Sequence, residues 1–135
     1  MQHRHLNIDS WQVECYFALT GYRNEIIEAL RWCGAPDGVI TRVQDNMRRN
    51  SLDTGFTFSA PHNRRSVMVI GLTSSSAEFV NSFCHELRHL TDDMARERGM
   101  ALCGEEVAYL CGDIALRLAD IVSQLACDHC RTCRR

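Results

Sequence analysis

The spacing of hydrophobic residues along the chain predicts a strand, a helix, two more strands and two long helices. Trp11–Leu19 alternates apolar and polar residues at its start, as strands do. Asn24–Cys33 places apolar residues near helical spacing, behind an Asn that can cap a helix. Thr54–Ser59 and the apolar run Ser66–Leu72 are two further strands, separated by a loop that contains a proline. Val39–Arg49 fits either a strand or a helical turn.

Two long helices are predicted in the second half of the chain. The first, Ala77–Arg98, follows Ser and Thr residues that can cap its first turn together with Glu78, and Gly99 stops it. The second is Glu105–Ala126. Its apolar stripe follows the 3.6-residue period closely and consists of Val107, Leu110, Cys111, Ile114, Leu118, Val122 and Leu125.

These elements predict one α+β domain over residues 1–135, with a small and mainly antiparallel sheet. The chain is 45% hydrophobic and 24% charged, which is ordinary globular usage. A net charge of -2 and a pI near 6.3 argue against a nucleic-acid binder, whose pI usually exceeds about 9. No run of about 18 apolar residues occurs, and the N-terminus has no apolar stretch. We therefore expect a cytoplasmic protein with no membrane span, and interpret His3–His5 as a solvated terminus.

The segment Cys84–His89 carries the most informative chemistry. Its His-Glu-x-x-His spacing places His85 and His89 one turn apart on one helix face, where both imidazoles can bind one zinc ion. Glu86 lies between them and can take a proton from a metal-bound water. Glu86 is therefore the candidate catalytic base, and His85 and His89 are the candidate ligands of Zn²⁺.

The two histidines lie on the polar side of the predicted helix. The helix is expected to pack through its apolar side and to present both imidazoles to a cleft or to solvent. The alternative is a solvated helix face that carries the motif by chance. The apolar side consists of Phe79, Val80, Phe83, Leu87, Leu90 and Met94, and the polar side of Glu78, Asn81, Ser82, His85, His89 and Asp92.

A catalytic zinc site normally has three protein ligands, so a third must come from elsewhere. The candidates are Glu105, Glu106, Asp92 and Asp93. Asp92 lies two turns beyond His85, about 10 Å along a straight helix, so it suits a hydrogen bond to a ligating imidazole better than the metal. Glu105 opens the next helix, which a short turn can fold back beside the first, and from there it can complete a tetrahedron.

The motif at 85–89, followed by Glu105–Leu110 (Glu-Glu-Val-Ala-Tyr-Leu), resembles the zincin metallopeptidases whose third ligand is a glutamate, the gluzincins. The Glu-x-x-Ala-Tyr-Leu arrangement is similar to short zincin-like proteins of bacteriophages and bacterial mobile elements. The resemblance covers Val67 to about Ala119. It implies a minimal zincin-like fold in which a strand, matched here by Ser66–Leu72, lines the substrate cleft.

The resemblance also implies a zinc-dependent peptidase that acts on a peptide or protein substrate. It assigns His85, His89 and Glu105 as the zinc ligands, with Glu106 as the alternative third ligand, and Glu86 as the general base.

Two other functions stay open. The first alternative to the peptidase is a non-catalytic zincin-fold module that binds or regulates a partner in a phage or mobile element. The second is a metal-free domain that carries the motif by chance. The presence of Glu86 favours the enzyme, because a structural zinc needs no base. Tyr109 is a candidate donor to the oxyanion, although its apolar surroundings in the sequence favour a core role. The chain is small, so a second subunit of a homo-oligomer is a candidate to complete the cleft.

The eight cysteines fall into two groups. Cys127, Cys130 and Cys133 lie in a Cys-rich tail over residues 126–135, at a spacing that suits a second metal or a redox pair. A frayed terminus is the plainer interpretation of this tail. The other five lie in apolar segments and are expected to be small buried side chains: Cys15, Cys33, Cys84, Cys103 and Cys111.

Overall fold

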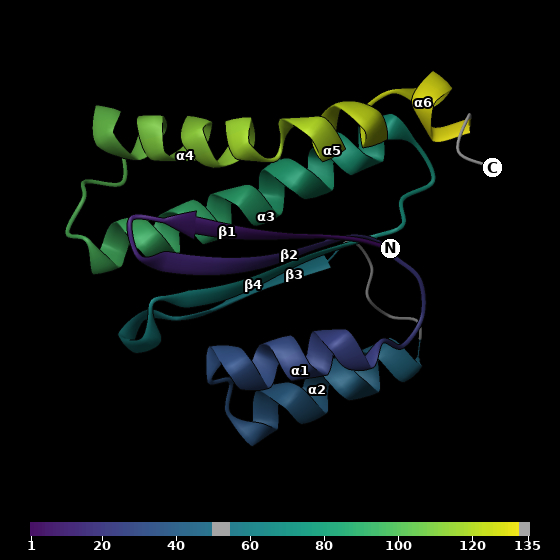
Figure 1. Ribbon diagram of the computed structural model, residues 1–135, viewed down its shortest axis with the longest axis horizontal. Coiled ribbons are helices and arrows are strands. Elements are labelled where there is room, and N and C mark those ends of the chain that lie inside the picture. Colours follow the sequence, from purple (N-terminus) through teal and green to yellow (C-terminus); the bar gives the residue numbers. More distant parts are fainter. Residues whose placement is uncertain (50–54, 133–135) are drawn as a thin grey trace.

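A four-stranded, mostly antiparallel sheet separates two layers of helices in the computed structural model, which describes residues 1–49 and 55–132 (Figure 1). The strand order is β1-β2-β4-β3; β2 and β4 run parallel, and the other neighbours are antiparallel. The α+β class predicted from the sequence is therefore confirmed. The strands are β1 (Gln2–Ile8), β2 (Trp11–Leu19), β3 (Gly55–Ala60) and β4 (Arg65–Gly71).

The parallel pairing of β2 with β4 requires a crossover, which the first helical layer and the edge strand β3 provide. The helices α1 and α2 cover one face of the sheet, and α3, α4 and α5 cover the other (Figure 1). No helix in the described part of the chain is both long and apolar enough to cross a membrane. The helices are α1 (Asn24–Cys33), α2 (Asp37–Arg48), α3 (Ser76–Glu97), α4 (Glu105–Arg117), α5 (Ala119–Leu125) and α6 (Asp128–Thr132), with a short 3₁₀ turn at Pro61–Asn63.

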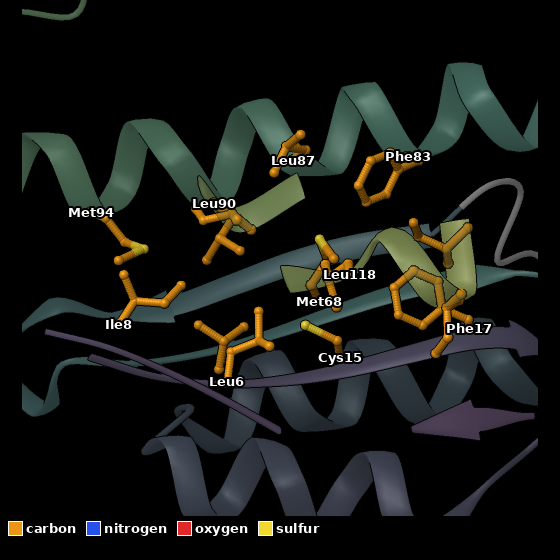
Figure 2. Packing of buried hydrophobic residues seen from close by; sticks show 14 of the residues in the cluster. Leu6, Ile8, Cys15, Phe17, Met68, Phe83, Leu87, Leu90, Met94 and Leu118 are labelled. Atoms are coloured by element: carbon orange, nitrogen blue, oxygen red, sulfur yellow. The ribbon is translucent and has the colours of Figure 1, made fainter. Parts of the chain in front are cut away.

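Hydrophobic cores lie on both faces of the sheet. The central strand β4 contributes to both, since Val67 and Val69 belong to the core under α1 and α2, while Met68 and Ile70 belong to the core under α3. This double burial explains why β4 reads as a continuous apolar run instead of an alternating one. Figure 2 shows the larger core, where side chains of α3 meet those of β1, β2 and β4.

The strand β1 was not predicted. His3 and His5 are exposed, as expected of a solvated segment, but they lie on a paired strand instead of a loose terminus. Leu6 and Ile8 are buried under the second helical layer, and the segment pairs with β2 along its whole length. A two-residue turn joins the strands, and both of its residues, Asp9 and Ser10, have positive φ angles of 49° and 72°. Asp is among the residues that tolerate this conformation, which hairpins of this length require.

Several expectations about the helices are also corrected. The segment Val39–Arg49, whose pattern fits either a strand or a helical turn, belongs to the helix α2. The long C-terminal helix is interrupted at Leu118, where α4 ends, and it resumes as α5. The side chain of Val80 is 44% exposed and that of Tyr109 is 75% exposed, so neither is a core residue, whereas Ser82 is buried.

The expectation of five buried cysteines holds for two of them. Cys15 and Cys33 are buried, and burial raises the pKa of the Cys33 thiol to about 11. Cys84 and Cys103 are exposed, and Cys111 is half-buried.

Candidate metal-binding and catalytic site

The helix α3 carries the His-Glu-x-x-His motif, and its start is fixed by the predicted cap. The hydroxyl of Ser75 accepts a hydrogen bond from the backbone N–H of Glu78 at 3.1 Å. The carboxylate of Glu78 in turn accepts hydrogen bonds from the hydroxyl and backbone N–H of Ser74, which hold its pKa below the usual range. Apolar residues from Phe79 to Met94 pack α3 against the sheet, so the direction of every other side chain on the helix is set.

His85 and His89 lie side by side on the exposed surface of α3, one turn apart. Their Nε2 atoms are 3.1 Å apart, and the two rings meet edge to face with centroids 4.8 Å apart. Two imidazoles bound to one tetrahedral zinc, each at about 2.0–2.1 Å, have their nitrogens roughly 3.3 Å apart. The separation of the two Nε2 atoms is therefore close to the distance that a shared zinc ion requires.

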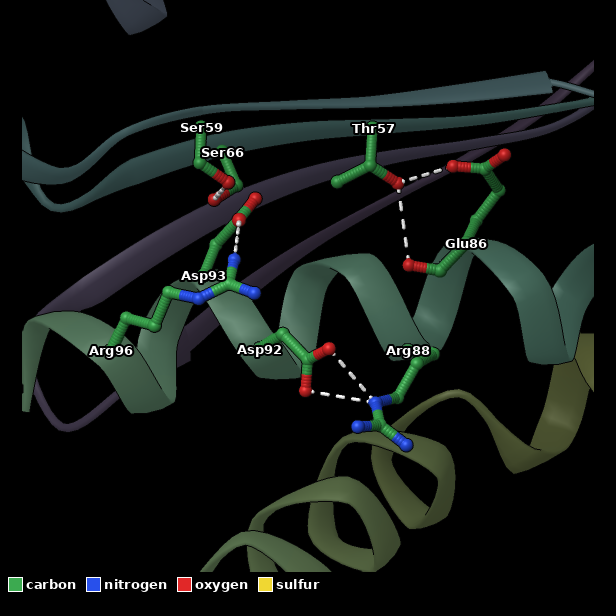
Figure 3. A network of polar contacts seen from close by, with 8 residues as sticks. All are labelled: Thr57, Ser59, Ser66, Glu86, Arg88, Asp92, Asp93 and Arg96. Carbon is green, nitrogen blue, oxygen red and sulfur yellow. Dashed lines mark hydrogen bonds and ion pairs between the residues drawn. The ribbon is translucent and has the colours of Figure 1, made fainter. Parts of the chain in front are cut away.

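Glu86 lies next to the histidines but points toward the sheet, and it is only 3% exposed. Its carboxylate Oε2 accepts a hydrogen bond from the hydroxyl of Thr57 on β3 at 2.6 Å (Figure 3). The same hydroxyl lies 3.3 Å from the backbone carbonyl of Glu86. The second carboxylate oxygen points away from Thr57 in Figure 3. The hydrogen bond from Thr57 thus holds one oxygen of a buried carboxyl group in place.

A small cleft of about 360 Å³ lies between β3 and α3, and Glu86 and His89 line it. Asp93, one turn beyond His89, contributes a second carboxylate and also forms an ion pair with Arg96 at 3.8 Å. The strand beside this cleft is β3, the edge strand, and not β4, which lies in the middle of the sheet. The resemblance matched the cleft strand to Ser66–Leu72, and that match is corrected here. The cleft is lined by Gly55, Phe56, Thr57, Glu86, His89 and Asp93.

Thr57 was not identified as a site residue from the sequence, and Asp93 was named only as one of four candidates for the third zinc ligand. The signal for Asp93 was its i+4 spacing from His89, which places both on neighbouring turns of one face. Thr57 gave no comparable signal, because its contact with Glu86 depends on which strand occupies the edge beside α3.

The structure does not bring Glu105 or Glu106 to the two histidines. Both glutamates are exposed in the first turn of α4, which packs on α3 through its own buried residues. A small cavity marks where the two helices meet, and it is lined by Arg88 and Thr91 of α3 and by Val107 of α4, among others. Within the described residues, no group of three His, Cys, Asp or Glu side chains is arranged to hold a metal ion. The assignment of Glu105, or alternatively Glu106, as third ligand stays a prediction.

Asp92 and Tyr109, the other candidates near the motif, have different surroundings from those predicted. Both carboxylate oxygens of Asp92 accept hydrogen bonds from the Nε of Arg88, at 2.8 and 2.9 Å (Figure 3). Asp92 is thus engaged by a guanidinium, and no hydrogen bond joins it to either imidazole. Tyr109 lies on the outer surface of α4.

The Cys-rich tail contains a pair of interacting thiols. Hydrogen bonds from the backbone and the thiol of Cys130 lower the pKa of Cys127. Cys133 lies outside the described residues. The second metal or redox site at Cys127, Cys130 and Cys133 therefore stays a prediction.

Comparison with protein-family models, with curated protein sequences and with solved structures gives no match for this chain. An assignment of function therefore depends on the geometry of the motif and its surroundings.

Proposed function

We propose that the protein is a zinc-dependent peptide hydrolase in which His85 and His89 bind the metal and Glu86 is the general base. The observation that carries this proposal is the pair of imidazole nitrogens 3.1 Å apart, with a buried and oriented carboxylate on the next residue. Zinc in such a site polarises the scissile carbonyl and lowers the pKa of a bound water toward about 7.

Glu86 would accept the proton of the attacking water and later deliver it to the leaving amine. The hydrogen bond from Thr57 supports this role, because it fixes one carboxylate oxygen of a residue that lines the cleft, while the other oxygen points away from Thr57. A base held in one orientation has less freedom to lose when the reaction begins.

The edge strand β3 is the proposed place for the substrate. Among the described residues no strand pairs with its outer edge, so an extended peptide can pair with its backbone N–H and C=O groups. A peptide bound there would lie along the cleft that Glu86 and His89 line. This arrangement favours an extended segment of a peptide or protein as substrate.

For the third ligand we retain Glu105 over Asp93. Asp93 is two turns beyond His85, about 12 Å along the axis of one helix, so it cannot share an ion with both histidines. Glu105 comes from a different helix that already packs against α3, and its side chain is exposed. We propose that zinc binding turns this side chain, or that of Glu106, toward the histidines.

The second candidate function is a zinc-binding module without turnover, which regulates or binds a partner. The observation that favours it is the absence, among the described residues, of a third ligand beside the two histidines. Both functions require metal at His85 and His89, and they differ in whether Glu86 has a role.

Metal binding is tested by calorimetric titration of the metal-free protein with zinc, with metal content measured after gel filtration. We expect one zinc per chain for the unmodified protein, and loss of nearly all of it in H85A and in H89A. The matched control is H62A, since His62 is exposed in the 3₁₀ turn after β3 and does not line the cleft. Full zinc occupancy in the double variant H85A/H89A would refute the site.

A further inference from the structure

A second hollow lies on the opposite side of the sheet from the His-Glu-x-x-His motif. It has a volume of about 750 Å³ and lies between the β1–β2 hairpin and α1. On this face the side chains of α1 and α2 form a core with those of β3 and β4. The hollow is lined by His3, Glu14, Tyr16, Tyr22, Arg23, Asn24, Glu25, Glu28, Ala29 and Trp32.

Aromatic rings form much of its wall. The imidazole of His3 stacks on Tyr16 with ring centroids 4.6 Å apart, and Tyr22 and Trp32 complete the aromatic lining. Two of these rings already attract cations of the chain itself: the Arg65 guanidinium lies 4.8 Å from the ring centroid of Trp32, and that of Arg48 lies 6.0 Å from Tyr22. Their quadrupoles therefore face positive charge in this structure.

The fixed charges in the hollow are mostly negative. Three glutamates and one arginine line it. Glu14 accepts hydrogen bonds from both His3 and His5 and so stays in place, whereas Glu25 has no ion-pair partner among the described residues. Burial, followed by the charges of Glu14 and Glu25, raises the pKa of Tyr16 to about 12. Negative charge thus reaches the ring at the base of the hollow.

We propose that this hollow binds an organic cation, an alkylammonium group held between the aromatic rings and the glutamates. Aromatic faces with nearby carboxylates are the surroundings that ammonium groups prefer. A metal ion is a poorer match, because the described residues include no group of three side chains arranged to ligate one. The ammonium comes either from a small amine or from a lysine side chain of another protein.

The test is an NMR titration of the full chain at pH 8 with choline, with its uncharged isostere 3,3-dimethyl-1-butanol, and with a peptide that has blocked ends and one unmodified lysine, whose side chain carries the ammonium group. We expect saturable shifts of amides in β1, β2 and α1 with choline, and a dissociation constant on the order of 1 mM or below. The uncharged isostere should give no saturable binding there. Tighter binding of the peptide than of choline would identify a protein side chain as the source.

Two variants locate the site. E25Q should weaken choline binding about threefold to fivefold, because it removes one exposed charge pair between Glu25 and the ammonium group. The matched control is E97Q, which removes the same charge from an exposed position at the end of α3 and should leave binding unchanged. Equal binding of the uncharged isostere, equal affinity in E25Q, or no saturable shift with any cation would each overturn the proposal. None of these results depends on zinc or on hydrolysis.

Discussion

The hydroxyl of Thr57 donates a hydrogen bond of 2.6 Å to the carboxylate of Glu86, which joins the edge strand of the sheet to the centre of the His-Glu-x-x-His motif. The two residues are 29 positions apart in the chain, and Glu86 is almost completely buried. A buried carboxylate needs hydrogen-bond donors, so this contact stabilises the fold as well as orienting the proposed base.

Removal of the Thr57 hydroxyl should therefore affect both stability and hydrolysis. T57V keeps the shape of the side chain but leaves Glu86 short of a donor, at a cost of about 1–3 kcal/mol in unfolding free energy. We expect at least a tenfold lower kcat/KM with unchanged zinc content. T57S keeps the donor and is the control. Urea unfolding and peptide cleavage check these outcomes, and a T57V variant as stable as the unmodified protein would contradict them.

Gly55 occupies a backbone conformation that other residues rarely adopt. Its φ is +146°, and a Cβ atom there would lie 2.0 Å from the carbonyl oxygen of Val69. G55A should distort the start of β3 and lower the unfolding free energy by about 2 kcal/mol or more.

Gly112 provides the opposite control for this substitution. It lies inside α4, and a Cβ atom there would meet nothing within 4 Å. G112A should raise stability by about 0.5–1 kcal/mol, since alanine favours helices. Thermal unfolding measures both variants, and equal effects of the two substitutions would contradict the backbone argument.

The third zinc ligand is identified by comparing carboxylate variants. E105Q should lower zinc affinity at least tenfold, whereas D93N should leave it within about threefold, because Asp93 lies too far along α3 from His85. Calorimetric titration of zinc into each metal-free variant measures this. A lower zinc affinity in D93N, with unchanged affinity in E105Q, would identify Asp93 as the third ligand. A lower zinc affinity in E106Q alone would identify Glu106 as the third ligand.

Tyr16 gives the protein a specific sensitivity to alkaline pH. Its pKa is raised to about 12 in the folded state, above the value near 10 of an exposed tyrosine. The folded state therefore retains a proton that the unfolded state loses, so stability is highest below about pH 10 and falls as the pH rises toward 12. Urea unfolding from pH 9 to 12 should show a flatter decline for Y16F. Identical slopes for both proteins would contradict this.

The elements with strong local signals were predictable from the sequence. The helix α3 has a long apolar stripe and a Ser-x-x-Glu cap, and the structure confirms both. Helical periodicity also predicts that Tyr109 is exposed, since it lies about 200° around the helix from Val107. The apolar neighbours of Tyr109 in the sequence favour a core role, but the helical angle decides which face a residue occupies.

The remaining features depend on contacts between distant segments. β1 consists mainly of polar residues with Leu6 and Ile8 as its buried positions, so its alternation is too short to stand out. The neighbour of α3 is decided by strand order, which local patterns do not contain. Glu86 could therefore be recognised as a base, but its partner Thr57 could not.

The most direct measurement is hydrolysis of a mixed peptide library by the unmodified protein and by E86Q at equal zinc occupancy. Glutamine keeps the size of the side chain and can accept the hydrogen bond from Thr57, but it cannot take a proton from water. The account predicts cleavage by the unmodified protein and a loss on the order of 10²–10⁴-fold in E86Q. Equal cleavage by both proteins, or no cleavage by either with zinc bound, would contradict it.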